Sequence, residues 1–371
     1  MLIEIHMLKN YAPTNLNRDD SGAPKTCMFG GVKRGRISSQ CLKHSWRTSK
    51  YLHDEIGGDA LGIRTRKLPE IISERLLAEG IDSEVIDYIR SELTGIGTKE
   101  GKGTKDNKTA QIIMYSKADI DAITGYVLEK VKGAKLADVK KNLKAKTLQE
   151  ELKKDSKRSL SLDMALFGRM VTSDAFADVE ASMQVAHAIS TNRVMMESDF
   201  FTAVDDLIDG NEESGSAMMG DIDYNSSCYY IYASIDVDKL RENLSINDNA
   251  DDIVHEVIPK LIETMAYTNP NGKQNSFAGH ALPSAVLVEV KEKHIPVSYA
   301  NAFEVPAKAD NEGGLIKNSI NKLVQQCNII QNAYGLPVTK RLWFCTETDS
   351  ISKVENAEEC STLASLIDNL M

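Results

Sequence analysis

The feature that most constrains this 371-residue chain is a reversal of charge near its N-terminus. The chain as a whole has a formal net charge of −10, but residues 16–50 hold eight lysines and arginines against two aspartates, a local net charge of +6. A local basic field attracts phosphate even when the molecule as a whole repels it. The segment therefore predicts a surface for a polyanion.

The same segment predicts a helix that begins after Ser38 or Ser39, both good N-caps, and stops at the glycines of 57–58. One stripe of this helix is basic and holds Gln40, Lys43, Arg47 and Lys50. Other positions suit packing and hold Leu42, Trp46, Leu52 and Ile56. A run of charges is usually a solvated face, but no acids interleave with this stripe, so phosphate binding is the better interpretation.

Composition indicates a soluble globular protein, with 42% apolar and 26% charged residues. No run reaches the roughly 18 apolar residues of a membrane helix, and residues 2–8 alternate as a strand does, unlike a signal peptide. We therefore expect a cytoplasmic protein without membrane contact. The six cysteines form no CxxC pair, so we expect reduced thiols, no metal and no cofactor.

The pattern along the chain predicts an α+β sheet domain of ferredoxin-like type, enlarged by insertions. Strands are expected at residues 2–8, 160–173, 198–207, 226–237, 284–290 and 341–346, and helices near 179–189, 251–266 and 316–333. Residues 61–158 are expected to form a helical insertion, broken at 95–108 by a mobile polar loop. Residues 208–225, between two of the strands, look too polar and too rich in glycine to pack.

A second basic region lies within this helical insertion. Residues 130–158 carry a net charge of +7, which leaves −23 on the chain outside the two basic segments. An apolar stripe of Leu136, Val139 and Leu143 leaves three lysines grouped toward solvent, namely Lys140, Lys141 and Lys144.

Motifs of known enzymes are weak in this chain. Gly30 and Gly35 have phosphate-loop spacing, but Arg36 and Ile37 stand where that loop needs lysine and a hydroxyl, so nucleotide hydrolysis is not expected. Asp19 and Asp20 could bind a metal for phosphodiester cleavage, but turn-forming carboxylates are the better reading because no further ligand accompanies them.

Two other groups of residues call for comment. Ser173, Asp174 and His187 could be interpreted as a hydrolase triad, but nucleophile-elbow glycines are missing, so a hydrolase is not expected. Phe200 and Phe201 are adjacent on a strand, so they point to opposite faces, and one of them is free to meet a base or a partner.

Several motifs together resemble the CasC family, the backbone subunit of Cascade, the type I-E CRISPR surveillance complex. They are LNRDD, FGGVKRGRISSQCLK, GRMVTS, AHAI, DFFTAVDDL, SYANAFE and AYGL. The resemblance covers almost the whole chain and is weaker in the helical insertion and the last thirty or so residues. It implies a hand-shaped subunit with an RRM-like palm (1–60, 159–191 and 227–371), a helical finger region (61–158) and a β-hairpin thumb (192–226).

The resemblance also implies a function. Copies of the subunit would polymerise along a guide RNA, together with other Cascade subunits, and present it to target DNA. The residues that match the family at the guide backbone are Arg18, Lys25, Ser38, Gln40, Lys43 and Arg47, to which the local positive charge adds Lys33, Arg34, Arg36 and Lys50. Those that would wedge at a displaced nucleotide are Met170, Phe200, Phe201 and Thr202. Target DNA phosphates would meet Lys140, Lys141 and Lys144.

Phe200 departs from the family pattern, in which we expect tryptophan, but a phenylalanine also presents a π face for stacking. The expected protein is not an enzyme. Two alternatives stay open: a metal-dependent endoribonuclease related to type III backbone subunits, which would use Asp19 or Asp20, and a single-stranded RNA-binding protein that acts alone.

Overall fold

The computed structural model describes residues 1–154, 158–173, 175–203, 218–245, 249–310, 314–347 and 351–370, which fall into two compact units. Unit 1 comprises residues 1–52, 184–236 and 255–371, and unit 2 comprises 53–183 and 237–254. Unit 2 contains the expected insertion at 61–158. It also includes residues 159–183, which the family resemblance placed in the palm.

Unit 1 is built on one large mixed sheet with the strand order β12-β11-β10-β1-β9-β7-β3-β2, while β6 and β8 also pair with β9. Its strands are β1 (Leu2–Thr14), β2 (Thr26–Phe29), β3 (Val32–Ile37), β6 (Met183–Val185), β7 (Ala188–Ser190), β8 (Glu197–Thr202), β9 (Met219–Asp236), β10 (Pro283–Lys291), β11 (Val338–Cys345) and β12 (Glu358–Cys360). β1 is antiparallel to both β9 and β10, whereas β11 and β12 pair parallel to each other. The first strand runs beyond the expected 2–8 because its pairing with β9 continues to Thr14.

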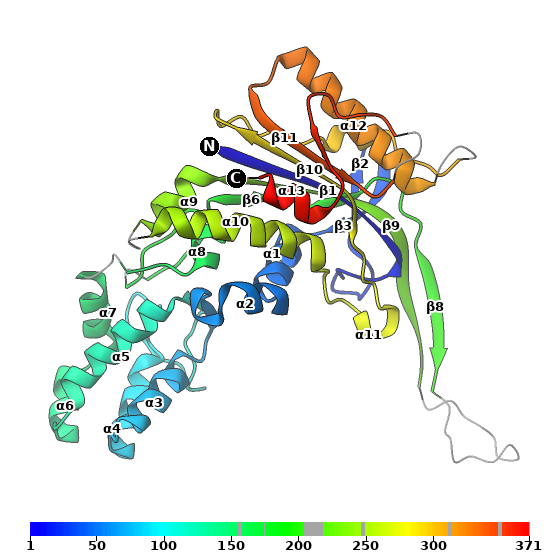
Figure 1. Cartoon of the computed structure of the whole chain (residues 1–371). Helices are drawn as coiled ribbons and strands as arrows, with labels where there is room; N and C mark the ends of the chain where they lie inside the picture. The colour runs from blue at the N-terminus through cyan, green and yellow to red at the C-terminus, as the bar shows by residue number, and fades with distance from the viewer. Residues whose placement is uncertain are drawn as a thin grey trace, which may run out of the picture. The chain divides into compact units, whose positions relative to one another are not determined.

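Helices cover this sheet. Ile320, Leu323 and Val324 of α12 share a buried core with Leu8 of β1 and Leu287 of β10, and α12 runs alongside these strands in Figure 1. The helices outside unit 2 are α1 (Ser39–Arg47), α11 (Gln274–Phe277), α12 (Leu315–Tyr334), α13 (Leu363–Asp368) and the 3-10 helix η2 (Ala300–Phe303). α2 (Lys50–Ile56) and α10 (Ala250–Tyr267) each span a boundary between the units.

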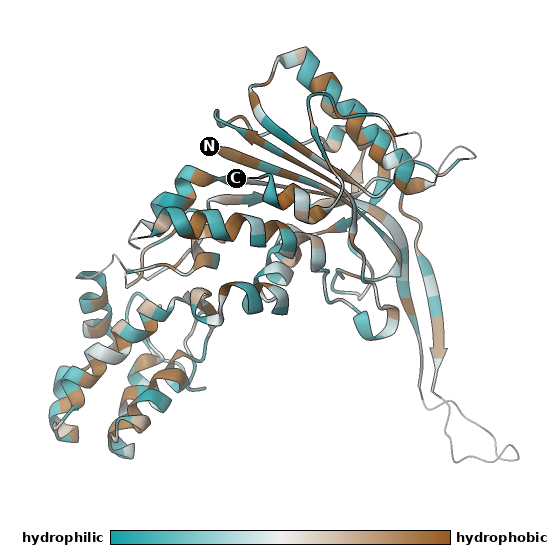
Figure 2. Ribbon diagram, in the orientation of Figure 1, coloured by the Kyte–Doolittle hydropathy of each residue, from teal (hydrophilic) through white to brown (hydrophobic). Residues whose placement is uncertain are grey.

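Unit 2 is mainly helical and has its own core. Its helices are η1 (Gly58–Ala60), α3 (Leu68–Ala78), α4 (Ser83–Leu93), α5 (Lys117–Val131), α6 (Leu136–Asn142), α7 (Ala145–Lys154), α8 (Leu162–Phe167) and α9 (Val237–Leu244), and β4 (Ile63–Thr65) pairs with β5 (Ile113–Tyr115). Apolar and polar residues alternate along these helices, as Figure 2 shows, and their apolar faces meet around Ile72, Ile89 and Ile123.

The predicted α+β class is confirmed. α10 and α12 confirm the helices predicted at 251–266 and 316–333, and β10 and β11 confirm the strands predicted at 284–290 and 341–346. The predicted strand at 160–173 is wrong, because α8 occupies its first half. The predicted helix at 179–189 is also wrong, because β6 and β7 pair with β9 there. In such short segments, pairing with a neighbouring strand outweighs local sequence pattern.

Three loop and helix predictions also need correction. Residues 95–97 of the loop expected to be mobile are buried. Residues 219–225, expected not to pack, begin β9, while residues 204–217 lie outside the described part of the chain. The helix expected to run to the glycines at 57–58 ends at Arg47, and α2 starts anew at Lys50, so the basic stripe is divided between two helices.

Within the described ranges, no helix is both long and apolar enough to cross a membrane.

Candidate nucleic-acid interface

The basic segment forms one end of the large sheet of unit 1. Strands β2 and β3 make an antiparallel hairpin there, and β3 leads directly into α1. The preceding loop is fastened to β3, since the Arg36 amide donates to the Lys25 carbonyl at 2.8 Å and the Lys25 amide donates to the Asn17 carbonyl at 2.8 Å. Loop, hairpin and helix therefore present their cations from one connected structure, which we call the basic edge (residues 16–50).

Asn17 is a residue of the basic edge that sequence reasoning missed. Its side-chain oxygen accepts the Ser38 amide at 2.9 Å, and the Ser38 hydroxyl in turn accepts the Cys41 amide at 3.2 Å as the N-cap of α1. The predicted cap is thus confirmed. Ser38 is only 6% exposed, so it serves first to start the helix.

The predicted RNA-binding residues differ in exposure. Arg18, Lys33, Gln40 and Lys50 are exposed, whereas Lys25, Arg36, Lys43 and Arg47 are half-buried. Partial burial lowers the pKa of Lys43 from its usual value.

Arg36 has a partner that the sequence did not indicate. Its Nη1 lies 3.2 Å from Nδ1 of His187, and its Nε donates to the Thr26 carbonyl at 3.3 Å. Burial lowers the pKa of His187, and the nearby charges of Arg36 and Lys25 lower it further. His187 is therefore held in the neutral form, in which its ring nitrogen can accept from Arg36.

The burial of Arg34 contradicts the prediction that its side chain binds RNA. It is fully buried, and its guanidinium donates to five backbone carbonyls, those of Phe29, Ser190, Thr191, Phe303 and Glu304. The same contact explains a glycine of the FGGV motif, because a Cβ on Gly30 would lie 1.9 Å from the Glu304 carbonyl oxygen. Arg34 holds the hairpin to its neighbours and has no donor directed to solvent.

Arg34→Ala should therefore lower the free energy of unfolding by about 3 kcal/mol or more, because it leaves several buried carbonyls without a donor. Chemical denaturation of the full chain measures this change. Lys33→Ala is the matched control, because the neighbouring Lys33 is exposed, and should change stability by less than about 0.5 kcal/mol. Equal effects of the two variants would contradict the structural role of Arg34.

The hairpin of β8 and β9 shows which of the two adjacent phenylalanines packs and which is exposed. Phe201 pairs with Gly220, and its ring lies over that residue, where an added Cβ would approach the ring to 3.0 Å. Phe200 pairs with Asp221 on the opposite face and is 62% exposed, and Thr202 is exposed on the same face. In Figure 1 the two strands extend as an arm from the rest of unit 1. Phe200 is thus the available ring, while Phe201 packs within the arm.

The arm is strongly acidic. Residues 194–236 contain no lysine or arginine, and the described part of the arm carries Glu197, Asp199, Asp221 and Asp223. Such an arm repels phosphate, so a contact with nucleic acid must use a ring face or backbone groups.

Met170 lies in unit 2, and its side chain is 92% exposed. The residue before it is an anchor that sequence reasoning missed: Arg169 is buried, and its Nη1 donates to Oδ2 of Asp119 at 2.6 Å. Arg158 donates to the other oxygen of Asp119 at 2.8 Å, and both guanidinium groups lie within 6 Å of the Phe176 ring. This buried cluster fixes the backbone from which Met170 projects.

Of the three lysines expected to meet DNA, Lys140 and Lys141 lie in the last turn of α6 and Lys144 lies between α6 and α7, while Val139 and Leu143 are buried. Lys140 and Lys141 are exposed. Lys144 donates to the Tyr88 hydroxyl at 2.8 Å and lies 3.4 Å from Glu92, and these interactions raise its pKa, the Tyr88 hydrogen bond most strongly. Lys144 is therefore partly neutralised within the protein.

Asp19 supports its own loop. Its carboxylate accepts from the Ser21 hydroxyl at 2.7 Å and from the Ser21 and Ala23 amides, and these bonds, led by that of the hydroxyl, lower its pKa. Across the described ranges, no group of three or more histidine, cysteine, aspartate or glutamate side chains is arranged to hold a metal ion.

Known proteins resemble this chain over nearly its full length. A chain of a solved structure titled "CRISPR RNA-guided surveillance complex, pre-nicking" is 25% identical, with a TM-score of 0.84 over 99% of this chain and 98% of that one. A chain of a second "CRISPR RNA-guided surveillance complex" shares the fold at 22% identity, with a TM-score of 0.59 over 99% and 97% of the two chains. A search of curated proteins found no match. The model of the CT1975-like protein family matches residues 3–369, and the chain belongs to that family.

Proposed function

We propose that this chain is a guide-RNA-binding backbone subunit of a CRISPR surveillance complex of type I-E. Several copies would assemble on one guide RNA in the cytoplasm with other subunits of the complex, and would present the RNA to target DNA. Unit 1 would be the RRM-like palm with its thumb, and unit 2 the finger region.

The observation that carries this proposal is the match over 99% of the chain to a subunit of an RNA-guided surveillance complex. The basic edge supports the proposal because it presents exposed cations on a hydrogen-bonded structure. Lysine and arginine contact the phosphate backbone of a nucleic acid, while base pairing recognises its sequence. The acidic arm with its exposed Phe200 supports two kinds of contact: the cations of the basic edge would bind phosphates, and the Phe200 ring would contact a base.

Nucleic acid that copurifies with the native complex tests the proposal. We expect short RNA of uniform length, with one constant portion and one portion that varies among molecules and matches the host's CRISPR spacers. RNA of random length and sequence would favour the stand-alone RNA-binding alternative and would contradict the proposal.

We also propose that Lys140 and Lys141 contact target DNA phosphates. Replacing both with alanine should leave assembly on guide RNA intact and weaken capture of double-stranded target by about tenfold, regardless of sequence. Lys144→Ala should have a smaller effect, because Glu92 already offsets its charge. Electrophoretic mobility shifts with target DNA measure both effects, and a loss of assembly on RNA would contradict this division.

We further propose that the chain does not cleave nucleic acid. Asp19 is hydrogen-bonded within its loop, and in the part of the chain that the structure describes neither Asp19 nor Asp20 belongs to a group of three or more potential metal ligands. With magnesium or manganese, the purified protein should leave guide and complementary RNA intact over hours. Metal-dependent cleavage that disappears in Asp19→Ala or Asp20→Ala would establish the endoribonuclease alternative instead.

A further inference from the structure

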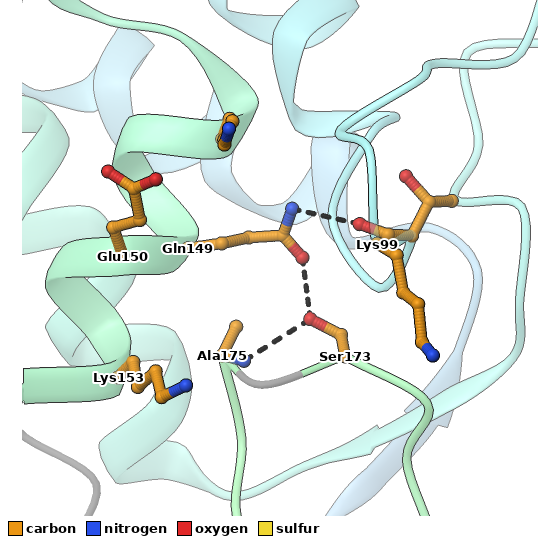
Figure 3. A pocket seen from close by; sticks show the side chains of 8 residues that line it. Lys99, Gln149, Glu150, Lys153, Ser173 and Ala175 are labelled. Carbon is orange, nitrogen blue, oxygen red and sulfur yellow. Dashed lines mark hydrogen bonds between the residues drawn. The ribbon is translucent and has the colours of Figure 1, made fainter.

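Two residues of the hydrolase motif considered above have separate partners, while the third, Asp174, lies outside the described residues. In unit 2, the Ser173 hydroxyl donates to the side-chain oxygen of Gln149 at 2.6 Å, as Figure 3 shows. In unit 1, Nδ1 of His187 lies 3.2 Å from Nη1 of Arg36. Ser173 therefore has a structural partner of its own, and the role of His187 belongs to the basic edge.

The contact between His187 and Arg36 joins two segments that are far apart in the sequence. His187 belongs to the AHAI motif, lies between β6 and β7 and is exposed. Arg36, on β3, is also held through its Nε, which donates to the Thr26 carbonyl at 3.3 Å. Since a guanidinium carries five N–H groups, Arg36 keeps donors for a ligand beyond these contacts.

The charged groups that act on His187 are both positive. Partial burial lowers the pKa of His187, and the charges of Arg36 and of Lys25, in the loop before β2, lower it further. In the free chain, a proton on His187 would place a second cation beside Arg36. The neutral imidazole is therefore the favoured form of His187 when no ligand is bound.

A protonated His187 would find no acid on the neighbouring elements. Acidic residues are absent from β2, β3 and α1, from residues 183–190 and from residues 228–234 of β9. The acids of the basic edge are Asp19, which is hydrogen-bonded within its loop, and Asp20. Cys27 of β2 stays a neutral thiol, because burial raises its pKa. An anion that neutralises this pair of cations must therefore come from outside these elements.

We propose that Arg36 and His187 together bind one phosphate of the RNA backbone, and that His187 takes up a proton as the phosphate binds. This inference rests on the proposed RNA-binding role and adds regulation by pH to it. The phosphate accepts a hydrogen bond from each side chain and removes the repulsion between the two cations. Proton and phosphate thus favour each other's binding, and by linkage RNA binds more tightly as the pH falls.

The sign of this effect follows from the two pKa values of His187. Without RNA the pKa lies below its ordinary value, and a bound phosphate raises it. The affinity for RNA should therefore rise as the pH falls through the pKa of the bound state, and should level off below the pKa of the free state.

Fluorescence anisotropy with a 12-nucleotide oligo(U) RNA tests the inference on the full chain. Uracil does not titrate between pH 8 and pH 5.5, and the ionic strength is held constant. We expect about fivefold tighter binding at pH 5.5 than at pH 8. His187→Gln keeps an acceptor for Arg36 but cannot take up a proton, so its affinity should not change with pH. The matched control is His44→Gln, at another exposed histidine of the basic edge, and it should keep the fivefold change.

NMR of the histidine rings gives the pKa of His187 directly. The full chain is labelled at the histidine ring carbons, and the His187 signal is assigned by its loss in His187→Gln. Adding the same RNA should raise this pKa by about 1. RNA binding without that rise, or a pH dependence that disappears in His44→Gln and persists in His187→Gln, would overturn the inference and leave the proposed function intact. Absence of RNA binding at every pH would contradict both.

Discussion

Reversing three exposed cations of the basic edge should weaken guide-RNA binding by about a thousandfold. The variant carries Arg18→Glu, Lys33→Glu and Lys50→Glu, which replaces three attractions to phosphate with three repulsions, together worth about 4 kcal/mol. All three side chains are exposed, so the fold should persist. Filter binding at several salt concentrations measures the effect, and the log-log salt slope should become shallower by about 0.7 for each phosphate that the variant no longer neutralises.

A matched control separates a local site from the general charge of the protein. Lys293→Glu, Lys340→Glu and Lys353→Glu make the same change in net charge within unit 1, near or on the strands β10–β12 at the other end of the sheet order. This control should bind RNA within about threefold of the unaltered chain. If both variants lose affinity alike, RNA binding does not reside in the basic edge.

Phe200→Ala should weaken assembly on guide RNA, because every copy of the chain in the assembly would lose the same stacking contact. Stacking of a base on an aromatic ring contributes about 1 to 3 kcal/mol, and each copy would forfeit that stacking energy. Phe200 is the exposed ring of the arm, whereas Phe201 packs over Gly220. Since the arm has no basic residue, its binding to RNA should resist added salt, unlike that of the basic edge.

The matched variants are Phe200→Trp, which keeps a π face and should bind as the unaltered chain does, and Phe200→Leu, which keeps bulk without that face. Mismatch penalties along the spacer provide an independent readout. If Phe200, Thr202 and Met170 displace nucleotides at regular intervals, mismatches at those positions should cost little. A penalty that varies smoothly along the whole spacer would contradict the wedge role of all three residues.

The elements that local sequence predicts well are those with a strong pattern over many residues. α10 and α12 repeat apolar residues over 18 and 20 positions, and Ser38 caps α1 as its hydroxyl suggests. The short segments β6 and β7 carry too few residues for a period. Pairing with β9, and for β7 also with β3, makes them strands. Topology of this kind depends on residues far away in the chain, which a local pattern does not contain.

The candidate site shows a similar limit. Charge count identified the basic edge, but it could not distinguish Arg34, whose five carbonyl acceptors come from separate parts of the chain, from the exposed Lys33 beside it. Asn17 and His187 are uncharged at neutral pH, so counting charges passes over them. Asn17 does have a local signal, since an asparagine before a turn often bonds nearby backbone.

The central claim is that several copies of this chain line one guide RNA, and native mass spectrometry tests it most directly. The purified chain is mixed with RNAs whose variable portion is lengthened in small steps, and the number of chains on each RNA is read from the mass of the complex. The account predicts that one chain is added each time the RNA grows by a fixed number of nucleotides. One chain per RNA at every length would contradict it.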